Sequence, residues 1–163
     1  MIRTLDAMLD VREQARQLVA TLETNLVEAR SRADRLPKRP KLFFEEWDEP
    51  LIFGIGWVSE LVEIAGGIDI FADRRHQGAA KNRIVTAEEV VAREPDLIIG
   101  SWCGKKFRPE RVMTRVGFGQ TPAVRHQDLY EIKSSSILQP GPAALTDGLA
   151  EFQRIIELWA TRP

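Results

Sequence analysis

Residues 83–102, RIVTAEEVVAREPDLIIGSW, decide the fold class of this chain. The apolar run at residues 96–101 predicts a buried strand, and residues 86–93 predict a helix that ends near Pro95. Thr86 and Glu89 have the spacing of a capping box, which leaves Glu88 projecting from the exposed start of that helix. A short helix followed by a buried strand is typical of an α/β protein.

The same alternation of strands and helices extends on both sides of this stretch. Strands are expected at residues 41–46 and 129–132, with a shorter candidate at 123–125, and helices at residues 57–65, 108–116 and 142–160. We therefore expect a Rossmann-like unit over residues 41–161, with a mostly parallel sheet flanked by helices.

One long helix is expected before this unit, over residues 4–36. Its apolar residues recur at intervals of three and four, and no glycine or proline interrupts it before Pro37. About 30 residues at 1.5 Å each give a rod of roughly 45 Å, which should extend beyond a small globule. The spacing allows either a coiled coil between two chains or a strut that packs along a larger body.

The composition excludes several classes of protein. The chain has 163 residues, of which 44% are hydrophobic and 29% are charged, as in a folded domain. A net charge of −1 argues against a nucleic-acid partner. One cysteine makes no internal disulfide and no zinc site on paired cysteines, and we expect no metal site. The sequence shows neither a signal peptide nor an apolar run of about 18 residues that could span a membrane.

Aromatic residues follow two of the expected strands. Trp47 and Trp102 come just after strand ends, and Phe107 belongs to the same loop as Trp102. Ligands of parallel sheets bind outside the carboxyl ends of the strands, and large apolar rings in loops need to be covered. These three rings are expected either to line a ligand cleft or to pack beneath their own loops.

Cys103 suggests a different hypothesis, a thiol enzyme. Lys105 and Lys106 lie close by in the sequence and could favour the thiolate. Neither of the two histidines stands where it would evidently serve as the base, and no pair of carboxylates has a spacing that argues for acid–base work. A passive cysteine is therefore the favoured interpretation.

Three stretches together resemble a known family. They are PKLFFEEWDEPLIFGIGWVSELVEIAGGIDIF at residues 40–71, RIVTAEEVVAREPDLIIGSW at 83–102 and SSSILQPGPAALTDGLAEFQRIIELW at 134–159. They are similar to the C-terminal half of class III substrate-binding proteins, which serve ABC importers of cobalamin, ferric siderophores and haem. The resemblance extends over nearly the whole chain.

The resemblance implies two Rossmann-like lobes joined by a rigid helix, with the ligand held in the cleft between the lobes. Residues 4–36 would be the bridging helix, residues 41–161 the C-terminal lobe, and the N-terminal lobe would be absent. It also implies a periplasmic or extracytoplasmic location, no enzymatic activity, no resident cofactor, and the membrane permease as partner. The face left by the missing lobe could drive formation of a homodimer.

The resemblance also implies roles for individual residues. Glu88 matches the exposed glutamate that docks onto arginines of the permease. The ligand-binding positions correspond to Trp47, Asp48, Asn82 and Arg83, with Trp102 nearby. The cobalamin receptors carry a tryptophan where this chain has Asn82, so ferric siderophores and haem stand beside cobalamin as expected ligands. A single lobe should bind cobalamin weakly or not at all, because a competent pocket buries about 70–90% of its ligand.

Overall fold

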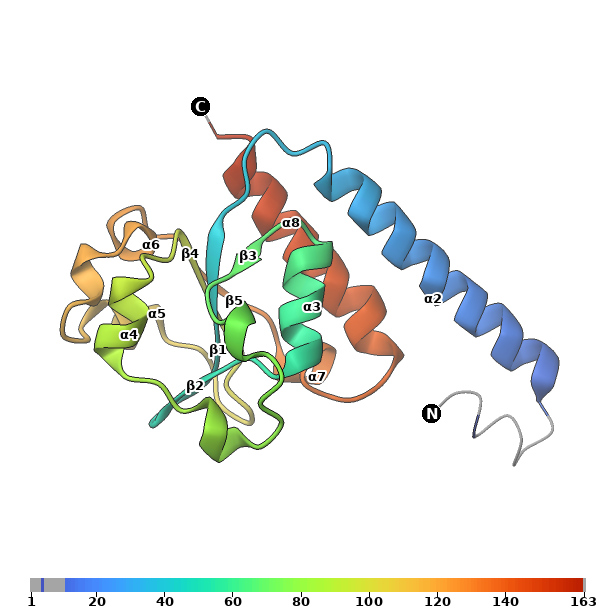
Figure 1. The fold of residues 1–163 in the computed structure, drawn as a ribbon, viewed down its shortest axis with the longest axis horizontal. Coiled ribbons are helices and arrows are strands. Elements are labelled where there is room, and N and C mark those ends of the chain that lie inside the picture. The colour runs from blue at the N-terminus through green and yellow to red at the C-terminus, as the bar shows by residue number, and fades with distance from the viewer. Residues whose placement is uncertain (1–3, 5–10, 163) are drawn as a thin grey trace.

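A five-stranded, mostly parallel sheet forms the centre of the computed structural model, which describes residue 4 and residues 11–162 (Figure 1). The strands are β1 (Lys41–Asp48), β2 (Leu51–Phe53), β3 (Ile68–Asp69), β4 (Leu97–Gly100) and β5 (Leu129–Glu131). The order is β2-β1-β4-β5, and β3 pairs with β1 next to β2. β1, β3, β4 and β5 are parallel, whereas β2 returns antiparallel to β1. The predicted fold class is confirmed.

The two central strands supply side chains to both faces of the sheet. All four residues of β4 are buried, as the run LIIG predicts for a central parallel strand. Alternate residues reach opposite cores, because side chains of a strand alternate between its faces. Leu42, Phe44, Leu97 and Ile99 join one core, and Phe43 and Ile98 join the other.

Helices cover both cores. One face carries α3 (Gly56–Ile64) and α8 (Leu149–Ala160), and the other carries α4 (Ala87–Ala92), α5 (Pro109–Met113) and α6 (Pro122–Arg125) (Figure 1). Short helical turns complete the chain at Ala72–Arg74, Ala80–Arg83, Phe118–Gln120, α7 (Ser134–Ile137) and Ala144–Gly148, the last of which is a π-helix that runs into α8.

The strand candidate at residues 123–125 is wrong. These residues lie in α6, where Pro122 occupies the first turn and the Thr121 hydroxyl accepts a hydrogen bond from the Val124 backbone N–H. Proline at the first helical position and threonine at the cap both favour a helix start. These two signals therefore prevail over the strand tendency of a short apolar segment.

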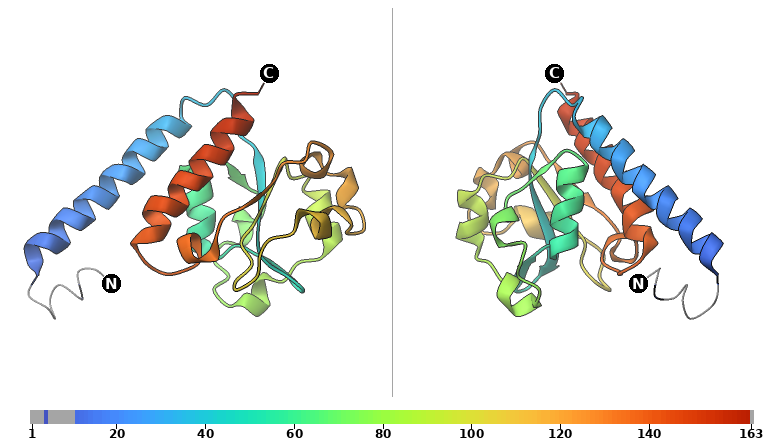
Figure 2. Two further views of the ribbon diagram at one scale, coloured as in Figure 1. Left: turned by 180° about the vertical axis from the view of Figure 1, so that it is seen from behind. Right: turned by 45° about the vertical axis from the view of Figure 1, so that its right-hand side comes forward.

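The long N-terminal helix is present as α2 (Arg12–Ala33). Its C-terminal part packs beside α3 and α8, and Ala29 is buried there. Its other end projects well beyond the sheet domain (Figures 1 and 2). Residues 5–10 of the predicted helix lie outside the described residues. No helix within the described part of the chain is long and apolar enough to cross a membrane.

Candidate functional site

The carboxyl ends of β1 and β4 bring several of the predicted ligand residues to one edge of the sheet. A hollow of about 360 Å³ opens there, and its walls include Trp47, Ile52, Cys103 and Leu138. The lining therefore joins the end of β1, the strand β2, the loop after β4 and the region after α7. An apolar hollow with an aromatic wall at a strand end has the character of a ligand site.

Trp47 lies half-buried at this edge. Its indole N–H donates a hydrogen bond to the Glu49 carbonyl at 2.9 Å, which fixes the ring. The Lys105 ammonium lies 4.0 Å from the centre of the same ring. A cation within about 6 Å of an indole face is attracted to it, so Lys105 and Trp47 form one unit.

Asp48 is buried directly behind this unit, with only 1% of its side chain exposed. Its Oδ1 lies 3.2 Å from the Lys105 ammonium, and its Oδ2 lies 2.7 Å from Arg111 Nη1. A buried carboxylate needs such partners, because an unpaired charge away from water is costly. Asp48 therefore joins the loop after β4 and the helix α5 to the end of β1.

Trp102 and Phe107 lie in the core, each with 3% of its surface exposed. Their rings meet edge to face with centroids 5.1 Å apart. The Trp102 indole N–H donates a hydrogen bond to Glu45 Oε1 at 2.8 Å. In this arrangement both rings pack beneath their own loop, and their contact with a ligand stays a prediction.

Glu45 is a member of this region that the sequence reasoning missed. It is fully buried, and Arg115 donates hydrogen bonds to its two oxygens at 2.6 and 2.8 Å. Burial raises the pKa of Glu45, while Arg115 and Trp102 act in the opposite direction. A glutamate inside an apolar strand is the signal that could have revealed this network.

Arg83 is also buried, beside the predicted ligand edge. Its guanidinium donates to both oxygens of Glu46, at 2.6 and 2.8 Å, and also to the Phe53 carbonyl. Asn82, the residue before it, is exposed, and its carbonyl accepts a hydrogen bond from Arg74. The structure therefore leaves the Asn82 side chain open to solvent and engages Arg83 internally.

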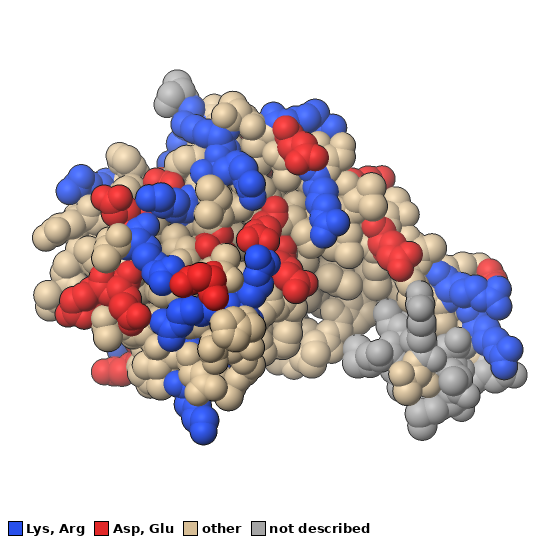
Figure 3. All heavy atoms as spheres, viewed as in Figure 1, with Lys and Arg blue, Asp and Glu red and all other residues tan. Residues whose placement is uncertain are grey.

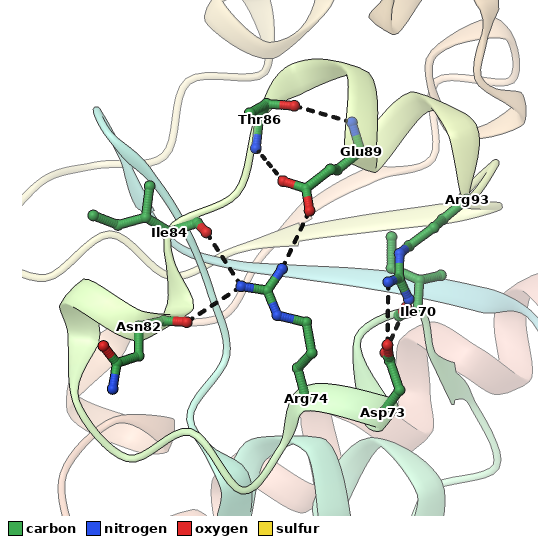
Figure 4. Close-up of polar contacts among 8 residues, drawn as sticks. All are labelled: Ile70, Asp73, Arg74, Asn82, Ile84, Thr86, Glu89 and Arg93. Carbon is green, nitrogen blue, oxygen red and sulfur yellow. Dashed lines mark hydrogen bonds and ion pairs between the residues drawn. The ribbon is translucent and has the colours of Figure 1, made fainter.

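The start of α4 has the capping box that the sequence predicts (Figure 4). The Glu89 backbone N–H donates to the Thr86 hydroxyl at 3.2 Å, and the Thr86 backbone N–H donates to the Glu89 carboxylate at 2.8 Å. Arg74 lies 3.3 Å from the same carboxylate. Glu88 remains exposed, and hydrogen bonds from its own backbone N–H and from the Thr86 hydroxyl lower its pKa.

A second arginine fixes the other end of α4. Arg93 donates to both oxygens of Asp73 and to the Ile70 carbonyl (Figure 4). It also lies 4.4 Å from the centre of the Phe71 ring. The hydrogen bond from Arg93 lowers the pKa of Asp73. Two clamps thus hold α4, and with it Glu88, against the segment that follows β3.

The described residues contain neither a cluster of metal-ligating side chains nor a polar partner for the Cys103 thiol. Cys103 is exposed, and within residues 11–162 its side chain has no hydrogen bond or ion pair. No group of three histidine, cysteine, aspartate or glutamate side chains in that range could hold a metal ion. Figure 3 shows basic and acidic side chains interspersed over the face in view, without a large patch of one sign.

Solved structures share this fold. A possible iron-binding periplasmic solute-binding protein from Staphylococcus epidermidis is 21% identical with a TM-score of 0.80, over 95% of this chain and 59% of that one. A periplasmic haem-binding protein from Roseiflexus sp. is 23% identical with a TM-score of 0.75, over 95% and 61%. The periplasmic vitamin B12-binding protein of Vibrio cholerae is 18% identical with a TM-score of 0.69, over 92% and 56%.

The chain thus spans about 60% of the length of the solved structures that it matches. No curated protein matches it. A model of the periplasmic binding protein family matches residues 1–136, which is most of the chain. This match confirms the resemblance drawn from the sequence motifs: the chain belongs to the periplasmic binding protein family.

Proposed function

We propose that the chain is part of a solute receptor that delivers a haem, a cobalamin or a ferric siderophore to an ABC importer. The family match over residues 1–136 carries this proposal. Three proteins of the same fold, each from a different organism, are named for iron, haem and vitamin B12, and these names support the proposed group of ligands. On this proposal the chain binds its ligand without chemical change and works outside the cytoplasm.

The ligand contacts are proposed at the carboxyl edge of the sheet. Trp47 and Asn82 are the predicted ligand residues with surface open to solvent, and the hollow beside Trp47 supports this placement. An indole face suits a planar or aromatic ligand, because offset ring stacking adds to the burial of apolar surface. Asp48, Arg83, Trp102 and Phe107 are proposed to hold these contacts in position from within.

Glu88 is proposed as the docking contact for the membrane permease. It is exposed, whereas its neighbour Glu89 is engaged by Thr86 and Arg74. A carboxylate on a fixed helix start offers an arginine a bidentate partner at a defined position. The two arginine clamps on α4 support the same role, since they restrict the movement of this helix.

A spectroscopic titration tests the ligand assignment. Haemin, cyanocobalamin and a ferric hydroxamate are each added to the chain at concentrations up to the millimolar range, and the Trp47 indole resonance is followed by NMR. We expect at least one of the three to shift this resonance. We expect the chain to bind cyanocobalamin more weakly than micromolar, because a single lobe covers too little of the ligand. The proposed function is wrong if neither haemin nor the ferric hydroxamate shifts this resonance, whereas the absence of a shift with cyanocobalamin alone agrees with the weak binding expected of a single lobe.

Two further measurements address the other hypotheses. Alkylation of Cys103 at neutral pH should be slow, since no base or cation in the described residues contacts its thiol. A fast reaction would favour a thiol enzyme. Sedimentation of the chain tests the proposed homodimer, and a monomer would contradict it.

A further inference from the structure

The turn after β4 has an exposed tip on buried flanks. Trp102 and Phe107 anchor it on either side in the core, whereas Cys103, Lys105 and Lys106 are exposed between them. Gly104 at the tip has a φ of 71°, a backbone conformation that residues other than glycine rarely adopt, and a Cβ there would meet nothing within 4 Å. Lys105 and Lys106 therefore lie in an exposed turn whose two flanking residues, Trp102 and Phe107, are anchored in the core.

Lys105 contacts two of the predicted ligand residues, Trp47 and Asp48, at the end of β1. Its ammonium lies 4.0 Å from the centre of the Trp47 ring and 3.2 Å from Asp48 Oδ1. A ligand that stacks on that face of Trp47 must displace Lys105 or include it in the contact. The side chain of Lys105 is 45% exposed, so this movement needs no rearrangement of the core.

Releasing Lys105 does not leave a buried charge unpaired. Asp48 has a second cation, Arg111, whose Nη1 lies 2.7 Å from its Oδ2. The other buried carboxylate at this edge differs, because Arg115 is the one cation that pairs with Glu45 among the described residues. Removing the sole partner of a buried charge is strongly destabilising, so Arg115 cannot leave Glu45 as readily as Lys105 can leave Asp48.

Further positive charge surrounds Lys105. Lys106 and Arg108 are exposed, and within residues 11–162 their side chains form no ion pair or hydrogen bond. Three carboxylates lie near this turn: Glu49 lies 3.5 Å from Arg111, Glu131 accepts a hydrogen bond from the Phe107 backbone N–H, and Glu110 is exposed. Lys106 and Arg108 are thus two cations beside Lys105 that have no ion-pair partner among residues 11–162.

We propose that Lys105 is a specificity-determining residue that selects ligands bearing a carboxylate. On binding, its ammonium leaves Asp48 and the Trp47 ring for the carboxylate of the ligand, the uncovered ring receives the apolar face of the ligand, and Arg111 retains Asp48. This inference rests on the proposed function and narrows its ligand to a complex with anionic groups, in preference to one whose periphery carries neutral amides.

The test compares two porphyrins that share one macrocycle and differ at two carboxyl groups. Gallium protoporphyrin IX has two carboxylates, and its dimethyl ester has none. Both are titrated into the wild-type chain and into Lys105→Gln. Lys38→Gln is the matched control, because Lys38 also lies over an indole, 5.0 Å from the centre of the Trp159 ring, but at the end of α8.

We expect Lys105→Gln to weaken binding of the diacid about threefold to fivefold, the range of a partly exposed ion pair, and to leave the ester unchanged. Added salt should weaken the diacid more in wild type than in Lys105→Gln, because exposed charges are screened. Lys38→Gln should change neither affinity.

Two results would overturn the inference alone: equal affinity of the wild type for diacid and ester, or equal losses for both in Lys105→Gln. If neither porphyrin, nor cyanocobalamin, nor a ferric hydroxamate binds the wild type, the proposed function fails and takes this inference with it.

Discussion

Arg83 and Glu46 form a bidentate ion pair, with Nη1–Oε2 and Nη2–Oε1 distances of 2.6 and 2.8 Å. The side chain of Arg83 is 3% exposed and that of Glu46 is 20% exposed. Through this pair the turn that precedes α4 is joined to β1 at the irregularity between Glu45 and Trp47 in the pairing of β1 with β2. The pair therefore determines how the Asn82 loop lies relative to Trp47.

Replacing Arg83 with alanine should lower the free energy of unfolding by about 3 kcal/mol. The substitution leaves the Glu46 carboxylate without its partner and opens a space under the loop, and breaking a buried ion pair typically costs 3–5 kcal/mol. Urea unfolding followed by circular dichroism measures the change.

Arg16→Ala is the control for this prediction. Arg16 and Glu13 form an ion pair at 3.6 Å with side chains that are 74% and 67% exposed, so its loss should change the stability by less than about 0.5 kcal/mol. Equal costs for Arg83→Ala and Arg16→Ala would contradict the structural role given to Arg83.

Local patterns predict the central elements of this fold well. The run LIIG of β4 and the capping box of α4 can be read from neighbouring residues alone, because burial on both faces and helix capping leave local signatures. β3 has two residues and β2 has three, and segments this short carry too little periodicity to be recognised.

The buried ion pairs could not be predicted in the same way. Arg83 and Glu46 are 37 positions apart, and Arg115 and Glu45 are 70 apart. No spacing rule links residues at such separations, because the fold alone brings them together. The family resemblance therefore points to Arg83, and its position after a strand points to Trp102, but neither reveals that Arg83 binds Glu46 and that Trp102 binds Glu45.

Glu88→Arg should abolish transport by the full-length receptor and leave its ligand affinity intact. The substitution reverses a charge on an exposed helix start, so like charges would face each other at the arginines that are proposed to receive Glu88 on the permease. Uptake of labelled ligand in cells gives the first readout, and a titration of the purified receptor gives the second.

Glu110→Arg provides the matched control for Glu88→Arg. Glu110 is likewise exposed in the first turn of a short helix, α5, so the same charge reversal is made in a similar local environment. Transport should survive in this variant. Unimpaired transport by Glu88→Arg would disprove the docking assignment, whatever the control shows.

Thr86→Ala should lower the free energy of unfolding by about 1 kcal/mol, since it removes the hydroxyl that accepts the Glu89 N–H at the start of α4. Chemical denaturation measures this loss. Thr114→Ala should cost less, because the Thr114 hydroxyl donates to the Glu110 and Arg111 carbonyls at a helix end and accepts no backbone N–H there. The reverse order of the two costs would refute the capping argument.

Asp69 gives the protein a predictable dependence on pH. Burial is the largest influence on its pKa and raises it above the ordinary value of 3.8. The folded state then holds a proton more tightly than the unfolded state, so this contribution to stability is present below 3.8 and is lost as the pH rises through the folded pKa. Asp69→Asn keeps an oxygen that can accept the Phe71 N–H and should remove this loss.

The comparison is made by thermal unfolding of the wild type and of Asp69→Asn across the acidic range. The variant should gain stability relative to the wild type as the pH rises from 3.8 toward neutrality. A constant difference between the two proteins over this range would show that the pKa of Asp69 is not raised on folding.

Gly100→Ala should destabilise the chain by about 1–3 kcal/mol through overpacking. A Cβ at Gly100, the last residue of β4, would lie 1.9 Å from Cδ2 of the buried Phe107 ring, so the strand and the ring cannot both keep their positions. Gly119→Ala is the control, because a Cβ there meets nothing within 4 Å.

In the double variant Gly100→Ala/Phe107→Ala, the total cost in free energy of unfolding should be smaller than the sum of the two single costs, because the ring that collides with the new methyl group is gone. Strict additivity, measured by urea unfolding, would show that Gly100 is required for a reason other than the close approach of Phe107.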